Sequence, residues 1–324
     1  MADSNSVFPT EVYERIIDRA GQAFDVPFLR TCALVSRSWY PRARYHLLRS
    51  VQLLNKSDVL SFVRMVRHGR GPMGLTNVGG MVGRLVIRGI EPDATLEQQR
   101  MKDEVVNVPQ PRARRSLVHL GTCAAMLAGR AKLANLTYLG IADGEWKEMH
   151  RNVGLHLSAA FPNVHWVDLF NIKFRSTADL GRLLCSFNSL VHVGLWVSPR
   201  RQAAFQDSPR AQFDPTAFTD MKALSKLKRL TLNGRYSARD LGEYLIAMNV
   251  AIRLDELYIG YYEQVPLAEV APLIRAATSL LGLDITLGNT ELASQDLADS
   301  TGTSMPSQYI SVNPNETTQR DQMY

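Results

Sequence analysis

The most regular feature of this chain is a hexad of the form apolar-x-x-apolar-x-apolar. Its last three positions fit a short strand with one buried face, because side chains two residues apart project to the same side of a strand. Eight copies occur, at Leu48/Val51/Leu53, Val82/Leu85/Ile87, Leu136/Leu139/Ile141, Val164/Val167/Leu169, Leu190/Val193/Leu195, Leu227/Leu230/Leu232, Leu254/Leu257/Ile259 and Leu280/Leu283/Ile285.

Regular spacing distinguishes these hexads from chance matches. The last six begin at residues 136, 164, 190, 227, 254 and 280, so successive starts lie 28, 26, 37, 27 and 26 residues apart. Four of these five intervals fall within the period of about 20–29 residues that is typical of leucine-rich repeats.

Amphipathic segments lie between the hexads. Their apolar residues recur three and four positions apart, as in helices with one buried face; the segments are Leu180/Leu183/Leu184/Phe187, Leu241/Tyr244/Leu245/Met248, Leu267/Val270/Ile274 and Val59/Phe62/Val66. A unit of one strand and one helix cannot bury its apolar face alone, so neighbouring units must stack. We therefore predict an α/β fold in which residues 48–287 form an irregular leucine-rich-repeat-like solenoid, with one strand and one helix per repeat and a curved parallel sheet.

The predicted repeats are interrupted twice and are followed by a polar tail. Residues 91–115 are charged and contain proline, and residues 198–218 contain three prolines. We interpret both as inserted loops, which folded chains tolerate well. Residues 288–324 contain ten serines or threonines and lack periodicity, which predicts an acidic, disordered tail.

The first residues follow a different pattern and predict a small helical domain over residues 7–47. Residues 1–6 are small and polar, and we expect them to be disordered. One helix is predicted from about residue 10 to residue 20, with Gly21 as its stop. A second helix, capped by Asp25, continues to Trp39 until Pro41 interrupts it, because its apolar residues keep helical spacing: Phe28, Cys32, Val35 and Trp39. A short third segment follows.

The net charge of +6 is unevenly distributed along the chain. Residues 288–324 carry a net charge of −4, whereas the residues before them carry +10. A basic body favours acidic partners. Its basic residues form no long run of the kind that nucleic-acid-binding proteins present.

Several kinds of chemistry find no support in the sequence. The three cysteines, Cys32, Cys123 and Cys185, are far apart, and neither CxxC, HExxH, GxSxG nor a Walker A motif occurs. We therefore expect a non-enzymatic protein without cofactor or metal. No stretch approaches the roughly 18 apolar residues of a membrane span, and the first residues do not resemble a secretory signal. We accordingly predict a cytoplasmic or nuclear location and no membrane partner.

Three segments of the N-terminal region resemble the F-box. They are FPTEV (8–12), LRTCALVSRSWY (29–40) and LLRSV (47–51). The run from Ala33 to His46 is similar to the F-box proteins of mushroom-forming fungi. The family usually has leucine at the position of Phe8 and often cysteine at that of Ser36. With the repeats, the chain resembles proteins of the F-box/leucine-rich-repeat architecture.

This resemblance implies a function without chemistry. The F-box would bind a Skp-family adaptor and join the chain to a cullin–RING ubiquitin ligase, while the repeats would hold an unknown substrate protein near the ligase and so raise its effective concentration. The residues expected to contact the adaptor are Phe8, Pro9, Val12, Ile16, Leu29, Cys32, Val35 and Trp39. The alternative is that these residues only pack the three helices together.

The second expected contact surface is the concave face of the predicted sheet. The residues between the apolar hexad positions project to this face, and many are aromatic residues or arginines, the types enriched in interface hot spots. The predicted substrate contacts are Arg84, Arg88, Tyr138, Trp166, Asp168, Phe170, His192, Trp196, Arg229 and Tyr258. Two other functions stay open: a repeat scaffold without a ligase role, whose helical start is only a cap, and, least favoured, a nucleic-acid-binding protein.

Overall fold

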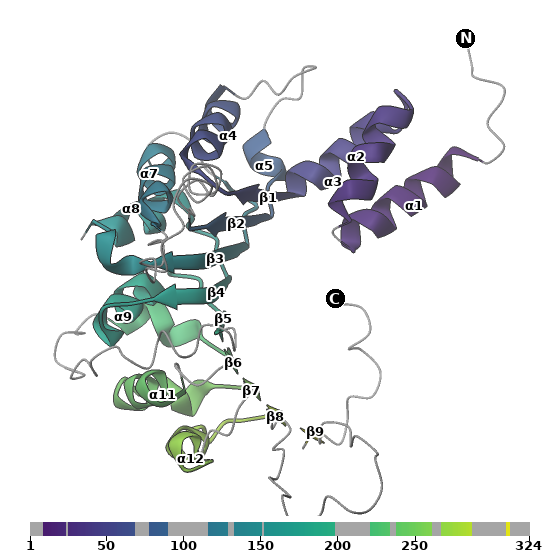
Figure 1. The fold of residues 1–324 in the computed structure, drawn as a ribbon. Helices are drawn as coiled ribbons and strands as arrows, with labels where there is room; N and C mark the ends of the chain where they lie inside the picture. Colours follow the sequence, from purple (N-terminus) through teal and green to yellow (C-terminus); the bar gives the residue numbers. More distant parts are fainter. Residues whose placement is uncertain are drawn as a thin grey trace, which may run out of the picture.

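The computed structural model describes residues 9–23, 25–68, 78–89, 116–128, 133–150, 152–197, 221–233, 238–260, 267–286 and 309–311. Within these ranges, three N-terminal helices lead into one sheet of nine strands, in which each strand lies beside its neighbour in sequence (Figure 1). The strands are β1 (Ser50–Leu53), β2 (Arg84–Arg88), β3 (Tyr138–Glu145), β4 (Trp166–Lys173), β5 (His192–Trp196), β6 (Arg229–Asn233), β7 (Glu256–Gly260), β8 (Gly282–Thr286) and β9 (Tyr309–Ser311).

The predicted hexads coincide with β1 to β8, which pair in parallel throughout. The second hexad positions form one row across the sheet, from Val51 to Leu283, and the third positions form another, from Leu53 to Ile285. Most of these side chains are buried in one continuous apolar core. The prediction of an α/β fold with a parallel sheet is therefore confirmed, and the alternation of strands and helices is compatible with strand–helix repeats.

The described helices form two groups, one before β1 and one after it. The first group comprises α1 (Thr10–Gln22), α2 (Val26–Val35) and α3 (Tyr40–Arg49). The helices after β1 are α4 (Lys56–His68), α5 (Val78–Met81), α7 (Val118–Leu127), α8 (Val153–Ala160), α9 (Thr177–Cys185), α11 (Ala238–Ala247) and α12 (Leu267–Ala276), with 3₁₀ turns η1 (Trp146–Glu148), η3 (Met221–Lys226) and η4 (Ala251–Arg253). Helices α4, α7, α8, α9, α11 and α12 lie on the side of the apolar rows (Figure 1). The opposite side, here called the open face, carries none of these six helices.

The N-terminal helices differ from the prediction at their ends. Helix α2 stops at Val35, because Ser36 is extended (φ −147°, ψ 144°) and its hydroxyl accepts a hydrogen bond from the Ser38 N–H at 3.2 Å. The predicted continuation to Trp39 is therefore wrong. Pro41 lies in the first turn of α3 instead, where its missing N–H costs no hydrogen bond. Gly21, predicted as a stop, lies inside α1.

The predicted insertions lie outside the described residues, whereas part of the predicted tail is described. Residues 91–115 lie outside the described ranges, as do residues 198–218. Within the tail, Tyr309–Ser311 form β9 and pair antiparallel with β8, so the prediction of a tail without regular structure does not hold at this strand. Its backbone pairs along the edge that β8 would otherwise leave open.

Candidate interaction surfaces

The three N-terminal helices enclose a small apolar core of their own. Ile17 of α1, Leu29 and Cys32 of α2, and Ala43 of α3 are all buried in it. Leu29 and Cys32 were predicted to contact an adaptor, but they are only 2% exposed. Both therefore serve helix packing in this arrangement.

Other large apolar side chains of α1 and α2 face solvent. Val12 and Ile16, one turn apart on α1, are 38% and 49% exposed, and Val35 of α2 is 63% exposed. Phe28 and Leu34, which were not in the predicted contact set, are 38% and 87% exposed. Adjoining exposed apolar side chains, such as Val12 and Ile16 on α1, are typical of contact surfaces. The structure thus separates the predicted set into core residues and residues available to a partner.

The remaining predicted adaptor contacts lie around α1. Trp39 is half-buried, and its ring centroid lies 4.7 Å from that of Tyr13. It therefore ties the α2–α3 connection to α1, as the packing alternative requires. Pro9 is exposed and precedes α1, and its carbonyl accepts a hydrogen bond from the Val12 N–H at 3.0 Å. Phe8 lies outside the described residues.

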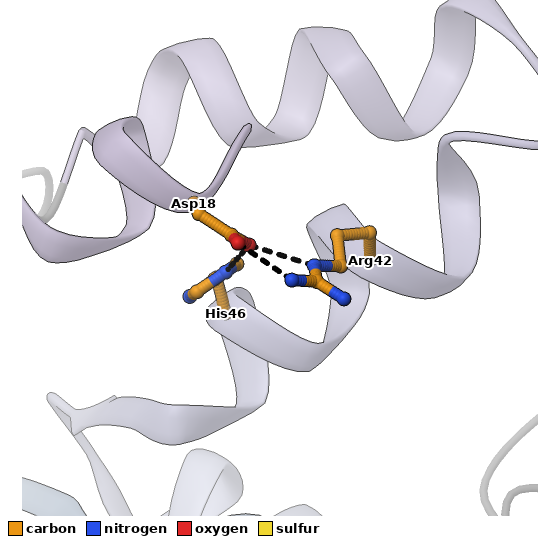
Figure 2. A network of polar contacts seen from close by, with 3 residues as sticks. All are labelled: Asp18, Arg42 and His46. Atoms are coloured by element: carbon orange, nitrogen blue, oxygen red, sulfur yellow. Dashed lines mark hydrogen bonds and ion pairs between the residues drawn. The ribbon is translucent and has the colours of Figure 1, made fainter. Parts of the chain in front are cut away.

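A polar network joins α1 to α3 beside this small core (Figure 2). Arg42 donates from Nε to Asp18 Oδ1 at 2.7 Å and from Nη2 to Oδ2 at 2.5 Å, and His46 Nε2 lies 2.8 Å from Oδ1. The hydrogen bond from Arg42 is the largest cause holding the pKa of Asp18 well below its usual range, against the opposing effect of burial. Two-pronged guanidinium–carboxylate pairing also fixes geometry, so the network sets how α3 crosses α1.

Gly21 is required where α1 meets this network. A Cβ atom at this position would lie 2.1 Å from His46 Nδ1 and 2.3 Å from its Cγ. His46 is 8% exposed and has little room to move. Gly21 was predicted to end the first helix and is the last residue but one of α1; its missing side chain also lets the imidazole approach the α1 backbone.

The open face is ordered into three rows by the register of the parallel strands. The first row contains Arg84, Tyr138, Trp166, His192, Arg229 and Glu256. The central row contains Val86, Gly140, Asp168, Gly194, Thr231 and Tyr258. The outer row contains Arg88, Ala142, Phe170, Trp196, Asn233 and Gly260. All ten predicted substrate contacts lie on these rows, although they span 175 residues of sequence.

Asp168 is the centre of this surface. It is 5% exposed, and its carboxylate accepts hydrogen bonds from rings on three strands. The Tyr138 hydroxyl donates to Oδ2 at 2.8 Å, while the indole N–H groups of Trp166 and Trp196 donate to Oδ1 at 2.9 and 3.4 Å. Asp168 was predicted to contact a substrate, but it is buried. It instead anchors and orients three aromatic side chains.

Glycines on both neighbouring strands make room for this arrangement. A Cβ at Gly194 would lie 2.1 Å from Asp168 Oδ1 and 2.6 Å from Trp196 Nε1. A Cβ at Gly140 would lie 3.2 Å from a methyl of Val86 and 3.3 Å from the Tyr138 ring. Glycine in a strand often marks such a close approach. That signal in the sequence could have located the cluster.

The first row forms a line of side chains in mutual contact, here called the ring row: Arg84, Tyr138, Trp166 and His192. The Arg84 guanidinium carbon lies 4.1 Å from the Tyr138 ring centroid, and its Nη2 donates to the Tyr138 hydroxyl at 3.3 Å. The Tyr138 and Trp166 centroids are 5.7 Å apart, and the His192 ring stacks on Trp166 at 4.2 Å and 13°. Contacts of this kind stabilise each other in a fixed geometry.

His192 is neutral at physiological pH in this setting. Burial is the main cause that lowers its pKa to about 4, the Arg229 charge lowers it further, and the Asp168 charge partly offsets both. Its Nε2 lies 3.3 Å from the Thr231 hydroxyl. Burial, with a contribution from Asp168, also raises the pKa of Tyr138 above its usual range. The tyrosine therefore keeps its proton for the bond to the carboxylate.

The other predicted contacts flank the cluster. Phe170 stacks on Trp196 at 5.7 Å and 17°. Arg229 Nη2 pairs with Glu256 Oε1 at 2.9 Å, and Arg88 is exposed at the end of β2. Tyr258 is half-buried on β7, two strands beyond His192, so it stands apart from the ring row.

Among the described residues, no group of three or more His, Cys, Asp or Glu side chains could hold a metal ion. None of the described helices has the length and apolar character that crossing a bilayer requires. No protein-family model and no curated protein matches this chain.

Proposed function

We propose that this chain is a substrate-receptor subunit of an SCF-type cullin–RING ubiquitin ligase. Its N-terminal helices act as an F-box that binds a Skp-family adaptor. Its strand–helix units act as leucine-rich repeats whose open face binds a substrate protein. The chain contributes proximity and no bond-making residue.

One observation carries the adaptor part of this proposal: the small helical unit leaves Val12, Ile16 and Val35 exposed. A unit of three short helices is marginal on its own. Burying its exposed apolar residues against a partner would add to a core of four fully buried side chains. Fully burying an isoleucine or valine is worth about 1.5–3 kcal/mol, so the half-exposed Ile16 alone could contribute about 1 kcal/mol to adaptor binding.

The substrate part is supported by the open face. Its aromatic residues and arginines come from strands β2 to β7 and are brought together by one uninterrupted parallel register. Solenoids commonly use such surfaces to bind extended partners. The three cysteines are free thiols, which fits the reducing cytoplasm or nucleus where we place the protein.

The test is co-purification of the full-length chain with a Skp-family adaptor, using two variants that each place a carboxylate at an exposed apolar position on a helix. Ile16→Asp places a carboxylate on α1 within the expected contact. Leu155→Asp makes the same change on α8, at a leucine that is 72% exposed. The lost apolar contact and the unpaired buried charge together should weaken binding by about 100-fold in Ile16→Asp. Leu155→Asp should bind like the unmodified chain.

Two results would count against the proposal. If the unmodified chain forms no complex with the adaptor, the repeats act as an interaction scaffold and the helices only cap them. If Ile16→Asp and Val12→Asp both bind as tightly as Leu155→Asp, the exposed residues of α1 do not form the adaptor contact.

A further inference from the structure

The ring row presents the edges of aromatic rings to solvent. Neighbouring strands lie about 4.8 Å apart, and Trp166 and His192 stack face to face at 4.2 Å. Trp166 therefore lies between His192 and Tyr138, whose ring centroid is 5.7 Å away on the neighbouring strand, and its outer edge is the part of the ring that remains for a partner. Trp166 is still 37% exposed. Ring edges carry partial positive charge and attract oxygen atoms and negative groups.

The charged side chains of the open face add to this positive character. Glu256 is exposed but already pairs with Arg229. Asp168 and Asp284 are buried at 5% and 8% exposure, and Asp168 is enclosed by hydrogen bonds from rings. In the three rows of the open face, the cations are Arg84, Arg88 and Arg229. Because Glu256 offsets Arg229, the excess positive charge among the exposed side chains of these rows lies at Arg84 and Arg88, and it complements negative charge.

Asp168 also makes the surface rigid. It fixes the orientations of Tyr138, Trp166 and Trp196, and Gly194 allows the close approach. A partner that lies on these rings does not have to immobilise them, so less of the binding free energy is lost to ordering. Pre-organised aromatic side chains next to arginines are typical of hot spots.

From these observations we infer that the open face binds an extended peptide segment bearing anionic side chains. The segment lies across the strands, with its negative groups on Arg84, Arg88 and Arg229 and its backbone or apolar side chains over Trp166. Arg84 and Arg229 are four strands apart, about 19 Å, which about six extended residues span. This inference rests on the proposed use of the open face as a binding surface, and it names the class of partner.

A nucleic acid fits the same surface less well. Single strands bind by stacking bases on exposed aromatic faces, whereas Trp166 lies between the rings of Tyr138 and His192. Arginines spaced along the strands also provide few phosphate contacts compared with the continuous basic groove of such proteins.

The experiment selects random 12-residue peptides on the immobilised full-length chain and measures the best binders by fluorescence anisotropy. Each binder is made in four forms that carry, at its acidic positions, Asp/Glu, phosphoserine, Asn/Gln or lysine. The carboxylate and phosphoserine forms distinguish the two sources of negative charge. The chain is tested unmodified and as Arg88→Glu, Trp166→Leu and Arg64→Glu. The last is the matched control, because Arg64 is an exposed arginine on α4, among the helices of the other side.

The expected result is enrichment of acidic residues and binding of at least one anionic form. Loss of one charge-assisted contact should weaken binding about tenfold in Arg88→Glu, and Trp166→Leu should weaken it similarly, whereas Arg64→Glu should match the unmodified chain. Enrichment of basic residues, equal affinity of the Asn/Gln form, equal binding by Arg88→Glu and Arg64→Glu, or tighter binding of an oligo-dT strand would each overturn the inference.

Adaptor co-purification on the same preparation separates this inference from the proposed function. Adaptor binding without a preference for anionic peptides overturns only the inference about the partner. Anionic peptide binding without adaptor binding overturns only the ligase role.

Discussion

Replacing Gly194 with alanine should destabilise the protein, because the added methyl group would collide with Asp168 and Trp196. The added Cβ would lie 2.1 Å from Asp168 Oδ1 and 2.6 Å from Trp196 Nε1. Overpacking of this kind costs about 1–3 kcal/mol. Displacing the carboxylate also weakens its bonds from Trp166 and Trp196, each worth about 1.5–3 kcal/mol when fully buried. Because Trp166 is partly exposed, we expect a total loss of about 2–4 kcal/mol.

The control is the same substitution at Gly242 of α11. There the nearest atoms to the added Cβ are Leu273 Cβ at 3.5 Å and Cδ2 at 3.8 Å, which are ordinary contacts. Alanine in a helix interior is favoured over glycine by about 0.5–1 kcal/mol. Gly242→Ala should therefore leave stability unchanged or raise it slightly.

Urea titrations followed by circular dichroism measure both effects as shifts in midpoint at constant slope. A double-mutant cycle assigns the cause, because Asp168→Ala removes one of the two groups that the new Cβ would strike. Gly194→Ala should cost less in the Asp168→Ala background than in the unmodified chain. The proposed collision with Asp168 is contradicted if Gly194→Ala lowers the free energy of unfolding equally in both backgrounds, or if the Gly194→Ala variant is as stable as the Gly242→Ala variant.

Two further predictions concern the helices and pH. Gly21→Ala should loosen the packing of α1 against α3, because the added Cβ would lie 2.1 Å from His46 Nδ1. Hydrogen exchange of the backbone amides in residues 10–49 should therefore accelerate, and unchanged protection would contradict the predicted clash. Burial lowers the pKa of His192 to about 4 and also lowers that of His119, so both histidines take up protons in the unfolded chain at a higher pH than in the folded chain. Acidification from about pH 7 to about pH 5 should therefore reduce the free energy of unfolding by about 1–2 kcal/mol. His192→Phe with His119→Leu should flatten this pH dependence in urea titrations, and an equally steep dependence would exclude both histidines as its source.

The strands could be predicted because their pattern is local and repeated. A pair such as Leu139 and Ile141 identifies one buried strand face, and the spacing to Val167 and Leu169 predicts the neighbouring strand. These pairs align in the observed register. The same alternation correctly placed the residues between them on the opposite face.

The full lengths of β3 and β4 depend on contacts between repeats that spacing does not reveal. Both strands continue past their hexads to Glu145 and Lys173. The extension passes through Asp143 and Asn171, which have φ values of 58° and 52°. The Asn171 amide donates to Asp143 Oδ1 at 3.0 Å, and this bond supports both left-handed residues, a conformation that Asp and Asn tolerate better than most residues.

The candidate surfaces were located more accurately than the roles of their residues. Helical spacing grouped Cys32 with Val35 and Trp39, but Cys32 packs against α1 and α3 while Val35 is exposed, and the helix ends before Trp39. Asp168 was assigned to the contact face by alternation alone. Its burial depends on hydrogen-bond donors from β3, β4 and β5 that converge only when the sheet forms.

Calorimetric titration of the full-length chain with a purified Skp-family adaptor is the most direct test of adaptor binding. We expect a one-to-one complex that Ile16→Asp weakens by about 100-fold and that Leu155→Asp leaves unchanged. We also expect the complex to recruit a cullin in size-exclusion chromatography. No measurable binding by the folded, unmodified chain would contradict the claim that its N-terminal helices connect it to a ubiquitin ligase.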